Sequence, residues 1–507
     1  MVKRNERISL KNSFFLMIIS IVGILIGFLR DLVLSNQYGA SDSSDIFLML
    51  LNIPIIVFAT IGAAINTTYI PLYSEINYNK TEEHSLKFTN KVMNIILIFC
   101  LILIIIFLIN AEKIVKIFAM GFSGEKLRIS IRLTRIIILS LFFIGPNYLL
   151  TSFLNLKNIF IIPAIVPIIT NLLIIIFIIF SKGNLTFLVI GTVFAYAVQI
   201  LILYYYSRKN NYKISLDLKL NDSNIKKMFC LVIPVLFGTA VAQFNEVIDR
   251  SLASTLGEGM LSCFTYSNRI SSSIQILFVS SLITLIYPKM NKLYSSKKVG
   301  EFKQLVIESL KNIIILILPL ASVVYIFSEQ IVLILFERGT FSRESTLITS
   351  GILKVYIVGI IFWTLREVLV RALYSLNNTK LATFNSVTAI FVNLILNLIF
   401  IDIYGYKGLA YASTITAFIV CILLARSLQK KIGPFIKIKD IFDIAKGIVI
   451  LSLIVIIIKV FYYYINNLKL PIIINLFISC GVGLSLYLFI VYKLKLLKIK
   501  DIFNKSE

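Results

Sequence analysis

Six charged side chains lie within or at the ends of long apolar runs, where they could bind an ionic group inside a membrane. They are Arg30, Asp31, Asp45, Asp249, Arg250 and Arg269. A charged side chain at the centre of a bilayer costs about 2.5 kcal/mol or more, so such residues are rare and pair with one another or with a substrate. Each of the six is therefore a candidate functional residue.

Arg269 is the strongest candidate because it lies about ten residues inside its run, roughly 15 Å from the nearer end at about 1.5 Å per residue. The other five could extend toward the membrane surface instead. A guanidinium presents a planar fork that makes two charge-assisted hydrogen bonds and keeps its proton. We therefore predict that Arg30 and Arg269 jointly bind a diphosphate headgroup.

The acidic residues of this set admit two roles. Asp31, Asp45 and Asp249 either hold the arginines in place when the site is empty, with Arg250 as a further cavity charge, or they carry a proton or a cation. Either role would make them supporting charges of the same cavity.

Two amides suggest a further site. Asn393 and Asn397 lie one turn apart on one face of a predicted helix, where their oxygens could join Asp249 in a monovalent cation site. Hydrogen bonding between helices through the amides is the alternative. Glu367 and Arg371 predict an i,i+4 ion pair of structural type. Apart from a coupling proton or monovalent cation, no cofactor is predicted.

Composition excludes several classes of protein. The chain of 507 residues is 58% hydrophobic and 15% charged, whereas ordinary soluble domains are roughly half apolar and a quarter charged. The net charge is +25, but the Lys and Arg residues lie between the apolar runs, so this charge does not indicate a nucleic-acid-binding protein. Five cysteines without a CxxC pair, one histidine and no GxxxxGK[ST] motif argue against a disulfide framework, a metal site and an ATP-driven pump.

The apolar runs predict an all-α polytopic membrane protein with about fourteen membrane-spanning helices. The runs are too long and too uniformly apolar for the strands of a membrane barrel. The predicted helices are 12–35, 44–74, 86–110, 128–155, 160–181, 185–207, 227–256, 259–288, 304–328, 345–375, 380–402, 407–429, 441–466 and 471–493. The first is expected to be an uncleaved helix because no small-residue cleavage site follows it.

The distribution of Lys and Arg sets the predicted direction of the chain. Most basic residues between the runs fall in every second loop, including the 208–227 loop and the C-terminal tail. Cytoplasmic loops hold this excess in membrane proteins. The sequence therefore predicts a multi-pass membrane protein with both termini in the cytoplasm.

A weak internal repeat suggests two related halves. The segment from Asp31 to Gly39 resembles that from Asp249 to Gly257, and Asn171 corresponds to Asn393. The predicted domains are two six-helix halves, 1–215 and 222–430, two further helices at 441–493 that are expected to face lipid or an acyl chain, and a tail at 494–507. Chance similarity between Leu- and Ile-rich segments is the alternative.

Several motifs resemble the MurJ (MviN) lipid II flippases of the multidrug/oligosaccharidyl-lipid/polysaccharide exporter superfamily. They include Gly27-Phe-Leu-Arg-Asp31, Ser44-Asp-Ile-Phe47, Ile248-Asp-Arg-Ser-Leu-Ala-Ser254, Tyr266-Ser-Asn-Arg269, Leu335-Phe-Glu-Arg-Gly-Thr-Phe341 and Arg371-Ala-Leu-Tyr-Ser-Leu-Asn-Asn-Thr379. The motifs occur in order over the first eleven predicted helices. The resemblance implies a transporter, not an enzyme, that acts in peptidoglycan and cell-wall biosynthesis and so in cell shape.

The resemblance further implies a flippase of the bacterial inner membrane for undecaprenyl-diphosphate-linked peptidoglycan precursor, with a central cationic cavity and a lipid-tail groove formed by the last two predicted helices. The weak repeat and the helix breaks at Pro54 and Pro234 predict alternating access of this cavity. Arg30, Asp45 and Arg269 fall on its functional charges, and cell-wall synthesis proteins and membrane lipids are candidate partners. Some family members carry further arginines where this chain has Ile24, Phe58 and Ala59. That departure keeps a flippase of capsule or teichoic-type lipid-linked glycan as the alternative.

Two other classes fit less well. A multidrug exporter of the superfamily would be expected to have acidic sites for cationic drugs, whereas this chain has cavity arginines. A membrane-embedded glycosyltransferase would need a carboxylate on a large outer loop, and the outer loops are short.

Overall fold

The computed structural model describes residues 2–215, 222–376, 378–435, 437–467, 470–494 and 496. All regular secondary structure in those residues is helical, and no strand occurs among them. This confirms the predicted all-α membrane protein. The apolar runs lack the alternation of barrel strands, so a helix is the element that satisfies their backbone hydrogen bonds within a bilayer.

The first part of the chain forms eight α-helices and a short 3-10 turn. They are α1 (Val2–Tyr38), α2 (Asp42–Asn79), α3 (Glu82–Ile109), α4 (Ala111–Phe118), α5 (Gly124–Ile137), η1 (Ile138–Ser140), α6 (Leu141–Leu156), α7 (Ile161–Ser181) and α8 (Leu185–Lys209). η1 joins α5 and α6 into one continuous pass, Gly124–Leu156.

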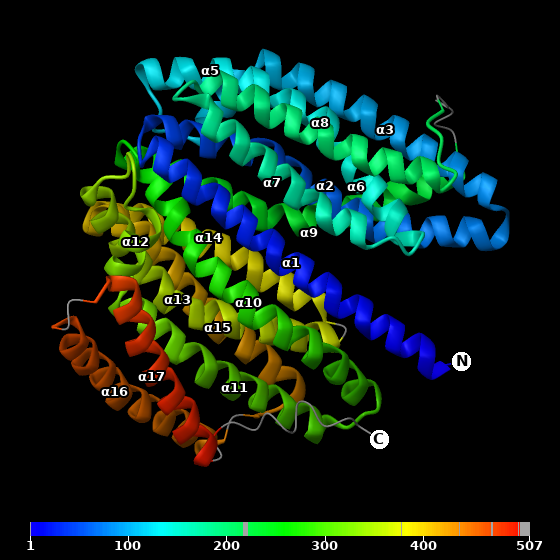
Figure 1. The fold of residues 1–507 in the computed structure, drawn as a ribbon. Helices are drawn as coiled ribbons and strands as arrows, with labels where there is room; N and C mark the ends of the chain where they lie inside the picture. Colours follow the sequence, from blue (N-terminus) through cyan, green and yellow to red (C-terminus); the bar gives the residue numbers. More distant parts are fainter. Residues whose placement is uncertain are drawn as a thin grey trace. The chain divides into compact units, whose positions relative to one another are not determined.

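The remainder forms nine α-helices. They are α9 (Ser223–Ala253), followed by η2 (Ser254–Leu256), α10 (Met260–Ser295), α11 (Val299–Ile326), α12 (Ser328–Phe336), α13 (Arg343–Ser375), α14 (Thr379–Tyr404), followed by η3 (Gly405–Lys407), α15 (Gly408–Ile432), α16 (Ile438–Asn466) and α17 (Ile472–Lys493). Figure 1 shows their arrangement.

The predicted membrane passes are recovered as helices. Eleven spans among the described residues are long and apolar enough to cross a membrane, and one of these runs through both α14 and α15. With α9 and α10, which are 31 and 36 residues long, they account for fourteen passes. The sequence did not predict α4 and α12, which have eight and nine residues, because both are far too short to cross a bilayer.

The order of helices repeats within the chain. α4 begins at Ala111 and α12 at Ser328, 217 residues later. α7 begins at Ile161 and α14 at Thr379, 218 residues later. The short helices α4 and α12 therefore occupy the same place in the two parts of the chain, which supports two six-helix repeats followed by α16 and α17.

The chain packs as two compact units. The first comprises Met1–Ser262 with Arg338–Ser342, and the second comprises Cys263–Glu337 with Arg343–Glu507. The first unit has a core of buried aromatic residues that includes Phe58, Tyr69 and Phe153, and α9 packs along α2 within it. The predicted boundary at 215–222 follows the repeat rather than this packing, and its role as a functional boundary stays a prediction.

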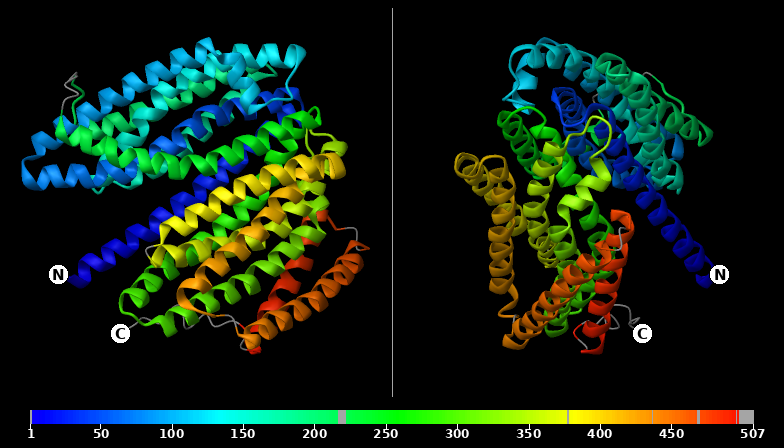
Figure 2. Two further views of the ribbon diagram at one scale, coloured as in Figure 1. Left: turned by 180° about the vertical axis from the view of Figure 1, so that it is seen from behind. Right: turned by 60° about the vertical axis from the view of Figure 1, so that its left-hand side comes forward.

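In the second unit α16 and α17 pack against each other, and α16 also packs on α11 (Figures 1 and 2). The Tyr487 hydroxyl of α17 donates to the Ile315 carbonyl of α11 at 3.1 Å. Several large apolar side chains of the pair are exposed, among them Leu453, Ile456 and Phe477. Such surfaces are stable in lipid but not in water.

Candidate functional site

Arg30 is fixed by two neighbours in the first unit. Its Nε and Nη2 donate to Asp31 Oδ1 at 3.1 and 2.7 Å, and its Nη1 donates to Asn171 Oδ1 at 3.1 Å. Asn171 lies on α7, which packs along α1. The Arg30 side chain is 16% exposed, whereas that of Asp31 is 2% exposed. An anion that reached this guanidinium would meet a fork already held in one orientation.

Asp45 is fully buried on α2 and accepts four hydrogen bonds from described residues. Lys126 Nζ and the Gly259 amide donate to Oδ2, both at 2.9 Å. The Ser262 amide and hydroxyl donate to Oδ1 at 2.8 and 2.6 Å. The first amides of a helix have no partner within the helix, and a carboxylate there is stabilised by the helix dipole. Asp45 therefore caps α10, which begins at Met260.

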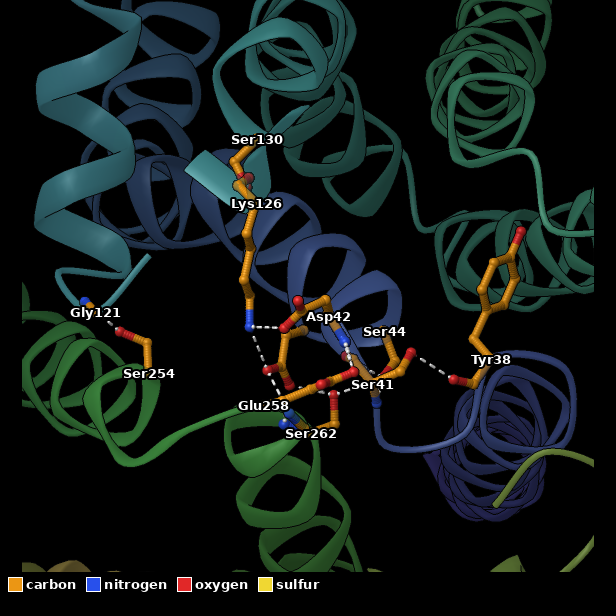
Figure 3. A network of polar contacts seen from close by, with 12 residues as sticks. Tyr38, Ser41, Asp42, Ser44, Gly121, Lys126, Ser130, Ser254, Glu258 and Ser262 are labelled. Atoms are coloured by element: carbon orange, nitrogen blue, oxygen red, sulfur yellow. Dashed lines mark hydrogen bonds and ion pairs between the residues drawn. The ribbon is translucent and has the colours of Figure 1, made fainter. Parts of the chain in front are cut away.

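Lys126 completes this polar cluster (Figure 3). Its ammonium group also forms an ion pair with Asp42 at 2.6 Å and lies 4.2 Å from the centre of the Phe122 ring. Because Lys126 and three further donors surround the Asp45 carboxylate, that carboxylate is satisfied within the protein. The structure thus gives Asp45 a structural set of partners, and its role as a cavity charge stays a prediction.

Lys126 and Ser262 were not predicted from the sequence as site residues, and Ser44 was found only as part of the Ser44–Phe47 motif. Ser262 Oγ lies 2.9 Å from Ser44 Oγ, and the two residues are 218 positions apart. This separation matches the period of the repeat, so the two serines are equivalent residues. Aligning the two repeats would have found them, whereas nothing in the local sequence of Lys126 indicates its partner.

Two glycines place loops against helix ends in a reciprocal manner within the first unit. A side chain at Gly339 would lie 2.1 Å from the Asn36 carbonyl oxygen, and one at Gly121 would lie 2.2 Å from that of Ser254. Gly121 and Gly339 are 218 residues apart, as are Asn36 and Ser254. The Gly121 amide donates to Ser254 Oγ at 3.0 Å. The loop of each repeat therefore contacts the helix end of the other repeat.

These contacts give a physical reason for the Leu335–Phe341 motif. Gly339 has φ +58°, a left-handed conformation that favours glycine. The next residue, Thr340, donates its amide to the Asn36 carbonyl at 3.0 Å. The motif holds the end of α1.

Asp249 and Arg250 lie on α9, where both are partly buried. Arg250 Nη2 donates to Glu246 Oε1 at 2.7 Å, an i,i+4 ion pair on the same helix. The sequence analysis did not consider Glu246 as the partner of Arg250. This pair fixes Arg250 along its own helix.

Arg269 is partly buried on α10 and belongs to the second unit. The hydroxyl of Ser273 donates to its backbone carbonyl at 2.7 Å. Arg30 belongs to the first unit. Joint binding of one headgroup by the two arginines therefore stays a prediction.

Asn393 and Asn397 are buried on α14 and bind each other. Asn397 Nδ2 donates to Asn393 Oδ1 at 2.6 Å, and Asn393 Nδ2 lies 3.4 Å from Ser413 Oγ on α15. The first bond lies within α14, and the second, to Ser413, fits amide hydrogen bonding between helices. The cation site with Asp249 stays a prediction. The predicted ion pair between Glu367 and Arg371 is present, with an N···O distance of 3.8 Å.

Comparison with known proteins identifies the family. The sequence model of the family described as "Lipid II flippase MurJ" matches residues 34–496, which is most of the chain. The chain belongs to the MurJ family of lipid II flippases. The probable lipid II flippase MurJ of Buchnera aphidicola subsp. Baizongia pistaciae is 28% identical over 428 residues, 83% of each chain. The lipid II flippase MurJ of Burkholderia cenocepacia is 22% identical over 417 residues, 80% of this chain and 81% of the relative.

Solved structures agree with membership of the MurJ family. A lipid II flippase MurJ in an inward closed conformation has a TM-score of 0.80 and 26% identity, and the match covers 94% of this chain and 97% of that one. A multidrug resistance MATE family transporter in an inward-facing conformation has a TM-score of 0.69 at 14% identity, covering 81% and 94%. The second similarity shows the fold alone. MurJ proteins are transporters, so the chain is not an enzyme.

Proposed function

We propose that the chain moves undecaprenyl-diphosphate-linked peptidoglycan precursor, lipid II, from the inner to the outer leaflet of the bacterial cytoplasmic membrane. Membership of the MurJ family over residues 34–496 is the observation that carries this proposal. The long apolar helices agree with a multi-pass membrane protein. Cell-wall synthesis proteins, which would supply or consume this precursor, are the candidate partners.

Arg30 and Arg269 bind the diphosphate in this proposal. The support for Arg30 is its partly exposed guanidinium, which Asp31 and Asn171 hold in position. A bidentate guanidinium suits a diphosphate because two parallel hydrogen bonds fix its orientation. Asp31, Asp45, Asp249 and Arg250 act as supporting charges.

The proposed mechanism is alternating access, in which the two repeats rock about the cationic cavity and expose it to one side at a time. A monovalent cation or a proton drives the change, with Asp249, Asn393 and Asn397 as the candidate cation site. Both amides are buried one turn apart on α14, and binding of a cation would require Asn393 Oδ1 to exchange its bond from Asn397 for the cation.

Orientation can be tested by cysteine labelling of a variant lacking the five native cysteines. We expect Lys213→Cys and Lys226→Cys to react with an impermeant maleimide only after the cells are opened, because both termini and the 208–227 loop are proposed to be cytoplasmic. Labelling of either position in intact cells would contradict this orientation.

The substrate can be tested by flipping assays in vesicles that contain the full-length protein. We expect lipid II to cross, and Arg269→Ala, Arg269→Lys and Arg30→Ala to reduce its flipping severely while the protein remains inserted. Arg208→Lys, near the end of α8, is the matched control and should keep full activity.

A capsule or teichoic-type lipid-linked glycan forms the second arm of that assay. The apolar residues Ile24, Phe58 and Ala59 favour this alternative because they leave fewer cations for a diphosphate. Flipping of the second lipid but not of lipid II would overturn the proposed substrate. Normal flipping by Arg269→Ala would overturn the proposed site.

A further inference from the structure

A lysine-rich cavity lies in the second unit, away from the charges considered above. It has a volume of about 780 Å³ and is lined by the first turns of α11 and α16, the segment that precedes α16, and residues after α17. Its walls carry five lysines and three carboxylates. We call it the lysine cavity; its charged residues are Lys303, Glu308, Lys311, Lys437, Lys439, Asp440, Asp443 and Lys446.

Two of the three carboxylates, Asp440 and Asp443, share Lys311 as their partner, which offsets one of their two negative charges. Lys311 Nζ lies 3.2 Å from Asp440 Oδ1 and 2.5 Å from Asp443 Oδ2, and the Lys311 side chain is only 14% exposed. This cluster joins α11 to α16. Glu308 accepts a hydrogen bond from Gln304 at 3.0 Å. Lys311 and the two aspartates are therefore structural.

The other lysines leave the cavity positive. Lys437, Lys439 and Lys446 are exposed, and among the described residues no carboxylate lies within 4 Å of their ammonium groups. Lys303 Nζ lies 3.4 Å from the Pro434 carbonyl, a weak contact. The net charge available to a ligand is thus positive.

The local backbone strengthens this preference for an anion. α11 begins at Val299 and α16 at Ile438, and both helices begin at the cavity. A helix N-terminus carries partial positive charge and unpaired amides. At the start of α16 Asp440 Oδ2 already accepts a hydrogen bond from the Lys437 amide at 3.0 Å, so the start of α11 together with the lysines favours a phosphate over a neutral group.

The surroundings indicate a lipid rather than a free ion. Ile307, Phe435 and Leu494 form apolar parts of the wall. Further along α16, Val449 and Leu453 are more than half exposed, so an acyl chain could lie against the helix while its headgroup occupied the cavity. The predicted topology places this end at the cytoplasmic leaflet, where basic pockets between helices bind anionic lipid headgroups.

We propose that the lysine cavity binds the phosphate-bearing headgroup of a lipid in the inner leaflet. Phosphate provides negative charge to a cavity whose five lysines outnumber its three carboxylates, and the apolar wall accepts the adjoining chain. The lipid is either a bulk anionic phospholipid or an undecaprenyl-diphosphate lipid. Binding here does not depend on transport, so it stands or falls separately from the proposed function.

Native mass spectrometry of the delipidated full-length protein tests this site. The test variant is K437Q/K439Q/K446Q, which leaves the Lys311 cluster intact. The matched control is K80Q/K213Q/K226Q, three exposed lysines of the first unit without ion pairs among the described residues. The probes are phosphatidylglycerol, phosphatidylcholine, undecaprenyl diphosphate and inorganic phosphate.

We expect the wild type and the control to bind phosphatidylglycerol in preference to phosphatidylcholine. The cavity variant should lose roughly tenfold or more in affinity for phosphatidylglycerol, because each lysine near an anionic headgroup contributes about fivefold. K437R/K439R/K446R, which keeps the charge, should retain binding. If the cavity variant lost affinity only for undecaprenyl diphosphate, the result would support the site and would identify that lipid as its ligand.

Three results would overturn the proposal. They are equal loss in the cavity variant and the control, equal binding of phosphatidylcholine, phosphatidylglycerol and undecaprenyl diphosphate by the wild type, and binding of inorganic phosphate without any lipid adduct. The first would indicate general attraction to a basic surface, the second no selection for net negative charge, and the third an ion site only.

Discussion

Ser44 and Ser262 bring their hydroxyl oxygens within 2.9 Å of each other although 218 residues separate them in the chain. They occupy equivalent positions at the starts of α2 and α10, so the repeats meet at matching residues. Ser262 also donates to Asp45. This contact joins the two helix ends that would have to separate if the site opened on that side.

A disulfide at this contact should stop transport. In a variant lacking the native cysteines, Ser44→Cys with Ser262→Cys should crosslink under oxidation and block lipid II flipping, and reduction should restore it. The measurement is vesicle flipping before and after reduction. Asn66→Cys with Ser152→Cys joins α2 to α6 within the first repeat, where the two side chains are hydrogen bonded, and is the control. Unchanged flipping by the oxidised Ser44–Ser262 variant would argue for a static groove.

Added side chains at the two reciprocal glycines should destabilise the protein. Gly339→Ala and Gly121→Ala place Cβ against the carbonyl oxygens of Asn36 and Ser254, and we expect a cost of about 1–3 kcal/mol each. Thermal unfolding in detergent measures it as a lower Tm. Gly481→Ala, which meets nothing within 4 Å on α17, should leave the Tm unchanged or raise it. Equal Tm values for all three variants would contradict the contacts.

Replacing Asp45 should destabilise the protein far more than replacing Asp42, although both residues bind Lys126. Asp45→Ala leaves the buried amides of Gly259 and Ser262 without their acceptor, while Lys126 keeps Asp42 as a partner. Each unsatisfied buried donor costs about 1–3 kcal/mol. Asp42, whose side chain is 48% exposed, forms a surface pair worth at most about 1 kcal/mol. Thermal unfolding of Asp45→Ala and Asp42→Ala compares them. Equal stability of both variants would mean that the Asp45 cap is not structural.

Asn171 should act on transport only through Arg30. Asn171→Leu removes the acceptor for Arg30 Nη1 but keeps the guanidinium and its bonds to Asp31. We expect weaker binding of lipid II with a smaller loss of flipping than Arg30→Ala causes, because the fork is misoriented and not absent. The apparent KM and maximal rate of flipping separate the two effects. A variant as inactive as Arg30→Ala would instead place Asn171 in direct contact with the substrate.

The sequence predicted the membrane helices well because each apolar run has the length of a bilayer and ends at charged or turn-forming residues. The predicted helix 185–207 is found at Leu185–Lys209, and 471–493 at Ile472–Lys493. It did not predict α4, an eight-residue helix too short for any span-based signal. Short helices of this kind are set by packing on neighbouring elements, here α5 and α9.

The candidate site was predicted only in part. Charges inside apolar runs identified Arg30 and Asp45, since a buried charge is costly wherever it lies. Their partners Asn171 and Lys126 lie 141 and 81 residues away. Such pairings depend on which helices pack together, and hydropathy alone does not contain that information.

The contact between Asn36 and Thr340 has a consequence for the order in which the protein is made. The two residues are 304 positions apart, so α1 enters the membrane long before the loop that holds its end has been synthesised. Until the Leu335–Phe341 motif emerges from the ribosome, the end of α1 lacks its backbone partner. Complete assembly of the first unit must therefore wait for about two-thirds of translation, and a truncated chain that stops before Gly339 would leave that unit unfinished.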